Sequence, residues 1–497
     1  MDRTERYDVV VVGAGNAGLA AAMAAHQAGA KTLVLEKAPR DWRGGNSYFT
    51  GGLFRFAFDN LDDVASVIAD MTEEERVAVD VGSYPQKAFY EDLMRVTESL
   101  SDPDMAEILV SQSLPTMQWL AKSGVRWILA MGRQSFKVGN VYKFFGNLVI
   151  EAVGGGVGLS DMQFEACEKM GIDVRYDTKV HTLVTDDHGR VTGVIIRQAG
   201  GADQAVDSGA VVLACGGFEA NAEMRTRYLG PGWELAHVRG TPYNTGDGHR
   251  MAMDIGARPR GHWSGAHACA WDYNSPADGG NRKLTDLYQK HSYPYSIIVN
   301  IDGQRFVDEG ADYRNYTYAK YGREILKQPQ RAAFQIFDQK TVKLQRDEYR
   351  IKEVTKGVSD TLEGLADQLG INQDAFVRTV REYNAACQGG EFNPSVLDGV
   401  GTEGITPPKS NWALPIDAPP YEGYAVTCGV TFTFGGLHIN TRAQVLDTEQ
   451  NLMGGLYAAG EIVGGLFYHN YPGGSGLMAG AVFGRLAGAS AAADALR

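Results

Sequence analysis

The feature that most constrains the fold is a glycine-rich turn near the N-terminus. The stretch Gly13-Ala14-Gly15-Asn16-Ala17-Gly18 fits the pattern GxGxxG, follows the Val-rich run 7–12 and opens the Ala-rich run 16–28. In this pattern one glycine permits a tight turn, one lets the backbone approach a pyrophosphate, and one lets helix and strand pack closely. A helix that starts at Asn16 presents free N–H groups to phosphates. The pattern therefore predicts a strand–turn–helix unit that binds a dinucleotide.

A carboxylate at the end of the next predicted strand supports the same interpretation. Glu36 closes the run 31–35 and stands 18 residues after Gly18. A carboxylate at that distance accepts hydrogen bonds from the ribose hydroxyls of a bound dinucleotide. We expect Glu36 and its neighbour Lys37 to contact the cofactor.

Size and composition exclude several other classes of protein. The chain has 497 residues, more than one small core needs, and a net charge of -13 without the clustered basic face of a nucleic-acid-binding protein. Glycines interrupt the apolar stretch 9–25, and the charged N-terminus is not followed by a signal-peptide core. The five cysteines are scattered without a CxxC pair, so we expect no metal site. We expect a cytoplasmic protein with no integral membrane segment and no nucleic-acid partner.

Changes in composition along the chain predict an inserted domain. The run 172–217 has the pattern of several strands, with a hairpin signal at 186–189. From residue 256 to 424, Tyr, Trp, Asn and Pro become frequent; Gly-rich strands then return, and 476–495 has the small residues of a terminal helix. We predict an α/β fold: a Rossmann-like nucleotide-binding domain formed by residues 1–255 and 425–497, with an α+β capping domain at 256–424.

Further glycine clusters point to a flavin nucleotide. Arg43-Gly44-Gly45-Asn46-Ser47 precedes Gly51-Gly52, and the late run 456–459 ends in Gly460-Glu461. Together with the turn Ala214-Cys215-Gly216-Gly217-Phe218 and the segment 303–309, this combination resembles the flavoprotein family of fumarate reductase and succinate dehydrogenase over nearly the whole chain. Within it, the stretches 43–53, 289–294, 308–321 and 470–474 are most similar to tricarballylate dehydrogenases.

The resemblance implies FAD as the cofactor. In that family the counterpart of Glu461 meets the ribityl chain, and the loop Ser475-Gly476-Leu477 holds the pyrimidine edge of the flavin, where a helix N-terminus stabilises negative charge. Respiratory members attach FAD through a histidine, but the stretch 46–49 holds none, so we expect non-covalent FAD. The predicted cofactor contacts are Gly13, Gly15, Asn16, Ala17, Gly18, Glu36, Lys37, Gly44, Gly45, Asn46, Ser47, Gly51, Gly52, Val180, Cys215, Gly216, Gly460, Glu461, Ser475, Gly476 and Leu477.

The first candidate for the reaction is the pair Tyr313-Arg314. Enzymes of this superfamily remove a proton next to a carbonyl while a hydride moves to flavin N5. Fumarate reductases place a proton-shuttling Arg four residues after the Glu of the segment that corresponds to 305–309, and ketosteroid 1,2-dehydrogenases place a Tyr there. The fourth residue after Glu309 is Tyr313 and the fifth is Arg314. Spacing favours Tyr313, with a phenol pKa lowered by the arginine, while the chemistry allows either residue. A surface ion pair of Arg314 is the alternative.

The second candidate is Tyr471. A Tyr before Pro472 resembles the ketosteroid enzymes, in which it donates a hydrogen bond to the substrate ketone. A packing role is the alternative. Thr431 and Phe432 stand where fumarate reductases carry a substrate-binding histidine.

A histidine is the third candidate. His267 corresponds loosely to a second family histidine, and His291 and His469 are similar candidates. Each is otherwise a structural histidine.

These residues predict an FAD-dependent dehydrogenase that desaturates the α,β bond of a carbonyl compound. A cyclic ketone suits the aromatic residues expected to line the cap, which are Trp263, Trp271, Tyr273, Tyr293 and Tyr295. A tricarballylate-like polycarboxylate is the close alternative, since Arg314, Lys290 and Lys137 allow a carboxylate; a fumarate-type reductase is another. A non-catalytic FAD electron-transfer protein and an oxidase are the rival classes. With only one dinucleotide fingerprint, we expect a quinone, a protein carrier or oxygen as electron acceptor.

Overall fold

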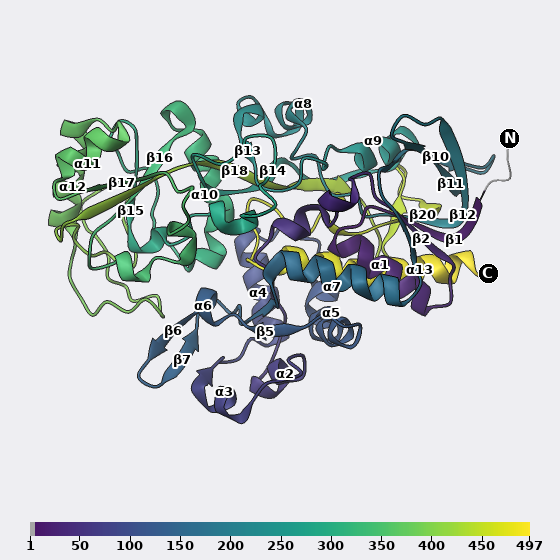
Figure 1. The fold of residues 1–497 in the computed structure, drawn as a ribbon, viewed down its shortest axis with the longest axis horizontal. Coiled ribbons are helices and arrows are strands. Elements are labelled where there is room, and N and C mark those ends of the chain that lie inside the picture. The colour runs from purple at the N-terminus through teal and green to yellow at the C-terminus, as the bar shows by residue number, and fades with distance from the viewer. Residues whose placement is uncertain (1–4) are drawn as a thin grey trace.

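The computed structural model describes residues 5–497 and shows three parts (Figure 1). A nucleotide part built on a large sheet lies at the right of the view, together with the first described strand and the C-terminus. The cap, which we define as residues 256–424, lies at the left. A helical lobe, residues 53–152, projects below the other two parts. This arrangement confirms the predicted Rossmann-like α/β fold with an α+β cap.

The eight-stranded sheet of the nucleotide part has the order β10-β11-β12-β1-β2-β9, and β20 and β19 extend it from β12. Its strands are β1 (Glu5–Val12), β2 (Thr32–Leu35), β9 (Asp173–Arg175), β10 (Thr178–Thr185), β11 (Val191–Gln198), β12 (Asp203–Leu213), β19 (Gln444–Leu446) and β20 (Leu452–Ala458). The central strand β1 pairs in parallel with β2 and β12, with Val11 opposite Val34 and Val212. Helices cover the central strands, which is why β1 and β2 carry continuous apolar runs.

Two small-residue helices pack against each other beside this sheet. They are α1 (Asn16–Gln27) and α13 (Ser475–Ala495). A Cβ atom added to Gly484 or Gly488 would overlap the backbone of Ala17 or Ala21, so the glycines permit this close approach. By length and composition α13 is the one helix within residues 5–497 that is long and apolar enough to cross a membrane, and 67% of its most apolar window is buried inside the protein.

The cap is organised around one long strand. The strand β18 (Tyr421–Leu437) pairs with four others and runs from the cap toward the nucleotide part (Figure 1). The predicted boundary at residue 424 falls inside β18, and the domain boundaries stay a prediction. The other strands of this sheet are β13 (His237–Val238), β14 (Pro259–Asp272), β15 (Ile297–Asn300), β16 (Ala333–Phe337) and β17 (Lys356–Ser359), and the helices nearby are α10 (Tyr318–Leu326), α11 (Leu362–Leu369) and α12 (Gln373–Ala386).

The helical lobe consists of helices of 4 to 20 residues and two small sheets. Its elements are α2 (Leu61–Ala65), α3 (Glu73–Ala78), α4 (Gln86–Val96), α5 (Pro103–Lys122), α6 (Met131–Gln134), β3 (Leu53–Phe54), β4 (Val79–Asp80), β5 (Trp127–Leu129), β6 (Ser135–Val138), β7 (Val141–Phe144) and β8 (Ile150–Ala152). The remaining helices are α7 (Gly155–Lys169), α8 (Ala222–Met224) and α9 (Asp247–Asp254). Most residues of the segment 63–124 lie in the helices α2 to α5.

Candidate active site

One large cavity runs from the start of α1 to the side of the cap that is next to the nucleotide part. It contains about 1970 Å³ of space free of protein atoms, including solvent at its mouth. Its lining includes both the glycine-rich turn before α1 and a group of polar side chains from distant segments of the chain. We call the part around Gly13, Asn16 and Glu36 the nucleotide end. The reaction end is lined by Arg239, His267, His291, Arg314, Tyr318 and Tyr471.

Backbone atoms form most of the nucleotide end. Gly13 adopts a φ of +102°, and a Cβ atom there would lie 2.5 Å from the carbonyl oxygen of Ala214. No side chain caps the N-terminus of α1; of its first N–H groups, that of Asn16 donates to Ser47 Oγ at 3.0 Å. An uncapped helix N-terminus that faces a cavity is a site for phosphate oxygens.

A fixed carboxylate lies beside this helix start. Glu36 follows β2, and its two oxygens accept the N–H groups of Ala14 at 2.9 Å and Ala38 at 2.8 Å. Burial raises the pKa of Glu36, and these N–H groups partly offset that rise. The side chain is therefore held in place as an acceptor for ribose hydroxyls.

Two glycines keep space free at the two ends of the cavity, because glycine has no side chain. A Cβ atom on Gly15 would meet only Ser47 Oγ and the Gly44 carbonyl, at 3.6 and 3.8 Å, which is ordinary contact. A Cβ atom on Gly476 would meet only the rings of Tyr471 and Phe432, at 3.5 Å or more. Packing within the protein does not demand glycine at either position. The free space, the uncapped helix and the held carboxylate fit a dinucleotide cofactor.

Most of the predicted cofactor contacts line this cavity. Those that do are Gly13, Gly15, Asn16, Ala17, Glu36, Lys37, Gly45, Asn46, Ser47, Gly51, Val180, Cys215, Gly216, Gly460, Glu461, Gly476 and Leu477. Four of the predicted contacts do not line the cavity, namely Gly18, Gly44, Gly52 and Ser475. Gly18 has the predicted packing role, because a Cβ atom there would overlap the backbone of Gly13.

Two phenols meet at the reaction end. Tyr318 begins α10, Tyr471 lies in the loop before α13, and their hydroxyl groups share a hydrogen bond. Burial raises the pKa of both phenols; for Tyr318 the positive charge of Arg239 and the hydrogen bond with Tyr471 partly offset the rise. Both side chains are therefore neutral at neutral pH.

Two imidazoles flank this pair of phenols. The ring of His267 lies 4.9 Å from that of Tyr318 and 5.0 Å from that of Tyr471, and the ring of His291 lies 4.8 Å from that of Tyr318. Burial, together with nearby guanidinium groups, lowers both histidine pKa values well below 6.5, so both rings are neutral. Within residues 5–497, neither nitrogen of His267 has a hydrogen-bond partner, nor does Nε2 of His291. Buried polar atoms of this kind, next to a cavity, are suited to a polar ligand.

Two guanidinium groups also line the reaction end, and they differ in their partners. Arg239 donates to Thr431 Oγ1 at 2.9 Å and forms an ion pair with Asp286. Arg314 contacts His291 Nδ1 at 3.3 Å and the carbonyl oxygen of Arg133 at 3.1 Å. In the described chain Arg314 has no carboxylate within ion-pair distance, and its Nε has no partner. Since a partly desolvated charge at a cavity is stabilised by a charge of opposite sign, Arg314 is poised to bind an anion.

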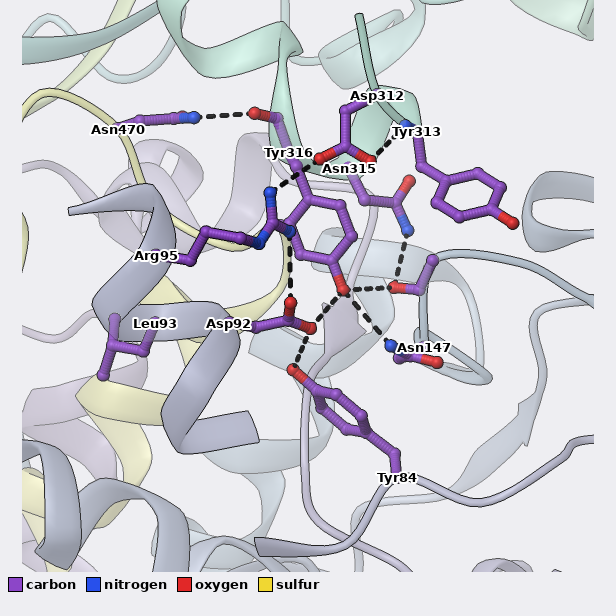
Figure 2. Close-up of polar contacts among 12 residues, drawn as sticks. Tyr84, Asp92, Leu93, Arg95, Asn147, Asp312, Tyr313, Asn315, Tyr316 and Asn470 are labelled. Atoms are coloured by element: carbon purple, nitrogen blue, oxygen red, sulfur yellow. Dashed lines mark hydrogen bonds and ion pairs between the residues drawn. The ribbon is translucent and has the colours of Figure 1, made fainter. Parts of the chain in front are cut away.

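The structure does not place Tyr313 at the cavity, contrary to the sequence prediction. Its ring packs beside Phe145 and Trp412, at 6.1 Å from each, and burial raises its pKa instead of Arg314 lowering it. The cause is a 3₁₀ turn that begins at Arg314, directly after Tyr313. The two neighbouring side chains therefore lie in different surroundings. Figure 2 shows the Tyr313 ring directed away from the contacts made by Asn315 and Tyr316. The alternative of a surface ion pair for Arg314 is not seen either, because Asp312 pairs with Arg95.

Other candidates also lie outside the lining. Lys290 is fully buried in an ion pair with Asp272 at 3.3 Å, Lys137 lies on the exposed hairpin β6–β7, and His469 does not face the cavity. The aromatic residues expected there, Trp263, Trp271, Tyr273, Tyr293 and Tyr295, are all absent from the lining. Trp271 and Tyr293 pack in the core of the cap, which is the usual place for large aromatic side chains. The apolar wall is formed instead by Phe432, Phe434 and Phe467.

Sequence reasoning missed Tyr318 and Arg239. Tyr318 lies in the stretch 308–321, whose resemblance to tricarballylate dehydrogenases was an available signal. Arg239 has no comparable local signal, because its place depends on contacts with Thr431 and Asp286, which lie far away in the chain.

The known proteins that are similar to this chain match it over the residues of both ends of the cavity. The family described as an FAD binding domain matches residues 8–477. The "Probable fumarate reductase Ifc3" of Shewanella frigidimarina is 30% identical, over 99% of this chain and 76% of the relative. The 3-oxosteroid 1-dehydrogenase of Mycobacterium tuberculosis is 26% identical, over 97% of this chain and 98% of the relative. The solved open conformation of a flavocytochrome c3 fumarate reductase is similar with a TM-score of 0.74 at 29% identity, covering 100% of this chain and 80% of that one.

Proposed function

Because this chain belongs to the FAD binding domain family and is an FAD-dependent oxidoreductase acting on CH–CH groups, we propose that its substrate carries a carboxylate next to the reacting carbon–carbon bond. The enzyme would dehydrogenate that bond, and the same residues would serve the reverse reduction. The observation that carries the proposal is Arg314, a half-buried cation at the cavity with no carboxylate within ion-pair distance in the described chain.

The nucleotide end supplies the contacts that FAD requires. The N-terminus of α1 would hold the phosphates, Glu36 would hold the ribose hydroxyls, and the start of α13 near Gly476 would hold the flavin ring. Bound FAD accepts or donates a hydride at the carbon that is oxidised or reduced.

The two phenols can move the proton that accompanies this hydride. We assign the role of acid and base to Tyr318, in place of Tyr313, because Tyr318 lines the cavity. The hydroxyl group of Tyr471 can donate to Tyr318 Oη, and the positive charge of Arg239 lies nearby. Both interactions stabilise the Tyr318 phenolate, which takes the proton from carbon in the dehydrogenation and which remains after the phenol gives its proton to carbon in the reduction.

Arg314 would bind the carboxylate and draw electron density from the neighbouring carbon. This makes the adjacent C–H more acidic, as proton abstraction requires. The neutral rings of His267 and His291 can add hydrogen bonds without bringing a further charge. The fumarate reductases among the relatives support a carboxylate substrate of this kind.

A cyclic ketone is the second candidate substrate. The phenol of Tyr471 and the walls formed by Phe432 and Phe467 suit a neutral ring with one carbonyl oxygen. The similarity to a 3-oxosteroid 1-dehydrogenase supports this candidate. It leaves the charge of Arg314 without an anion, and for that reason we rank it second.

Anaerobic stopped-flow spectroscopy of the flavin tests the proposal. The purified protein is mixed with tricarballylate, succinate, a cyclohexanone-type ketone or a ketosteroid, and bleaching of the oxidised flavin is followed. We expect a carboxylate to bleach the flavin. Arg314→Gln should keep bound FAD but need about 10- to 100-fold more of that carboxylate, because a hydrogen bond to a charged group is lost.

Lys327→Gln is the matched control, since Lys327 is an exposed cation on the surface near the end of α10, paired with Glu324. It should behave as the unaltered protein. Bleaching by ketones alone, with Arg314→Gln unaffected, would replace the proposal with the second candidate. If no compound bleaches the flavin, the chemically reduced protein is mixed with the unsaturated acids, and failure there too overturns the carboxylate proposal.

A further inference from the structure

A half-buried carboxylate outside the cavity has no part in the function proposed above. Asp92 lies on α4 in the helical lobe and does not line the cavity. It accepts hydrogen bonds from Tyr316 Oη at 2.6 Å, Tyr84 Oη at 2.9 Å and Arg95 Nη2 at 3.1 Å (Figure 2). Three donors around one carboxylate compensate its partly desolvated charge, and they fix its position.

The charge of Asp92 is balanced through a phenol. Burial raises the pKa of Asp92, but the hydrogen bond from Tyr316 and the positive charge of Arg55 more than offset this, so the pKa ends below its usual value. Arg55 is fully buried and donates from Nη1 to Tyr316 Oη at 3.1 Å. Tyr316 therefore stands between a half-buried anion and a fully buried cation, which leaves its hydroxyl group little freedom.

The same network reaches the loop that carries Tyr471. Arg55 Nε donates to the carbonyl oxygen of Gly473 at 2.8 Å. Asn470 Nδ2 donates to the carbonyl oxygen of Tyr316 at 2.6 Å, and the N–H of Gly473 donates to the carbonyl oxygen of Asn315 at 2.8 Å. The loop before α13 is thus joined to the turn Arg314–Tyr316 on both sides of Tyr471.

A second interaction, an ion pair, fixes the chain just before that turn. Arg95, one helical turn after Asp92, pairs with Asp312 Oδ2 at 2.8 Å (Figure 2). Asp312 and Tyr316 lie two residues before and after Arg314, so α4 holds both sides of the residue that lines the cavity. Tyr318 follows Tyr316 by two residues and begins α10.

We propose that Asp92 is a positioning residue for the reaction: through Tyr316 and Arg55 it holds the turn bearing Arg314 and Tyr318 in register with the loop bearing Tyr471. The inference rests on the proposed function for the roles of those three residues. It adds that α4, a helix of the helical lobe that does not line the cavity, sets the geometry of the reaction end. A displacement of about 1 Å among reacting groups can lower a rate about 100-fold.

The variant Asp92→Asn keeps the size of the side chain and removes its charge. We expect bound FAD and its visible spectrum to be retained, and hydrogen–deuterium exchange to rise about tenfold in residues 312–318 and 470–474 together. With a substrate that bleaches the flavin, the rate should fall about 10- to 100-fold, with a smaller change in KM. Tyr316→Phe removes one hydroxyl group only, and it should raise exchange in the same two segments; the double variant should be little worse than either single one, since both break one network.

Glu91→Gln is the matched control, because Glu91 neighbours Asp92 on α4 and its side chain is exposed and paired only with Lys87. It should leave exchange and rate unchanged. The exchange measurement needs no substrate, so it decides the inference even if the carboxylate proposal fails. Faster exchange confined to α4 in Asp92→Asn, or unchanged exchange in Tyr316→Phe, would overturn the positioning role; an unchanged rate in both variants would do the same.

Discussion

The two ends of the cavity are built in opposite ways. At the nucleotide end, one stretch of chain from Gly13 to Glu36 supplies the turn, the helix start and the held carboxylate, largely with backbone groups. At the reaction end, single side chains arrive from five separate segments, at Arg239, His267, His291, the stretch 314–318 and Tyr471.

This difference separates what a local pattern can specify from what only the whole fold can specify. A backbone site depends on allowed conformations and close approach, and these are encoded by glycine at fixed spacing. A side-chain site depends on distant segments meeting in register, so its chemistry can change while the nucleotide end stays the same. The three predictions below test this comparison, beginning with the largest expected effect.

The first prediction concerns Gly13. The variant Gly13→Val should lose bound FAD and destabilise the protein by about 3–5 kcal/mol, since it combines a φ of +102° with an overlap against Ala214. The flavin content of the purified protein and its urea unfolding curve measure both effects.

Gly29→Ala is the control for backbone strain alone. Gly29 has a φ of +93° but nothing within 4 Å of the added Cβ atom, so we expect a loss of about 1–2 kcal/mol and normal flavin content. Equal flavin loss in both variants would show that close approach at Gly13 is not what the nucleotide end requires.

The second prediction compares the two tyrosines near Arg314. Tyr318→Phe should keep FAD and lose turnover by about 10²- to 10⁴-fold, because the hydroxyl group that moves the proton is gone. Tyr313→Phe removes an equivalent hydroxyl group that lies outside the cavity and should stay within a few-fold. Steady-state rates with the substrate found by flavin bleaching provide the measurement, and a reversed ranking would return the role of base to Tyr313.

The third prediction concerns the pH dependence of stability at the reaction end. His267 is neutral in the folded protein with a pKa well below 6.5, whereas in the unfolded chain its pKa is about 6.5. Between these values the unfolded state binds more protons, so the stability due to neutral burial is complete above about pH 6.5 and falls as the pH drops. His267→Gln should reduce this slope by up to about 1.4 kcal/mol per pH unit.

Urea unfolding between about pH 7 and pH 5 measures that slope. His188→Gln serves as control, because His188 lies exposed in the turn between β10 and β11. An unchanged slope in His267→Gln would mean that the imidazole is already solvated in the folded protein.

The sequence predicted the fold and the nucleotide end because their signals are local. The turn at Gly13, the strand before it and the carboxylate at Glu36 follow from spacing within one short stretch. Tyr471, Arg314 and His267 were also predicted, and all three line the cavity.

The other features of the reaction end depend on local turns and long-range contacts, which the spacing of residues in the sequence does not show. Counting from Glu309 selected Tyr313, but the 3₁₀ turn at Arg314–Tyr316 sends Tyr313 toward Trp412 and leaves Tyr318 at the cavity. Trp271 was expected at the cavity from composition, yet it packs in the cap core. The position of Arg239 is set by partners that only the folded protein brings together.

The packing of α13 against α1 has a consequence for how the protein is made. The nucleotide end opens with Gly13, but the cavity wall opposite it includes Leu477, at the start of α13. At a synthesis rate of about 5–20 residues per second, a ribosome needs roughly 25–90 seconds to add the about 460 residues between them.

During that time α1 has no α13 to pack on, and β12 lacks its neighbour β20. The nascent chain therefore exposes the apolar face of α1 while the whole cap is being synthesised. The complete nucleotide end can hold FAD only after residues beyond 477 have left the ribosome, and until then the exposed apolar face of α1 is open to aggregation.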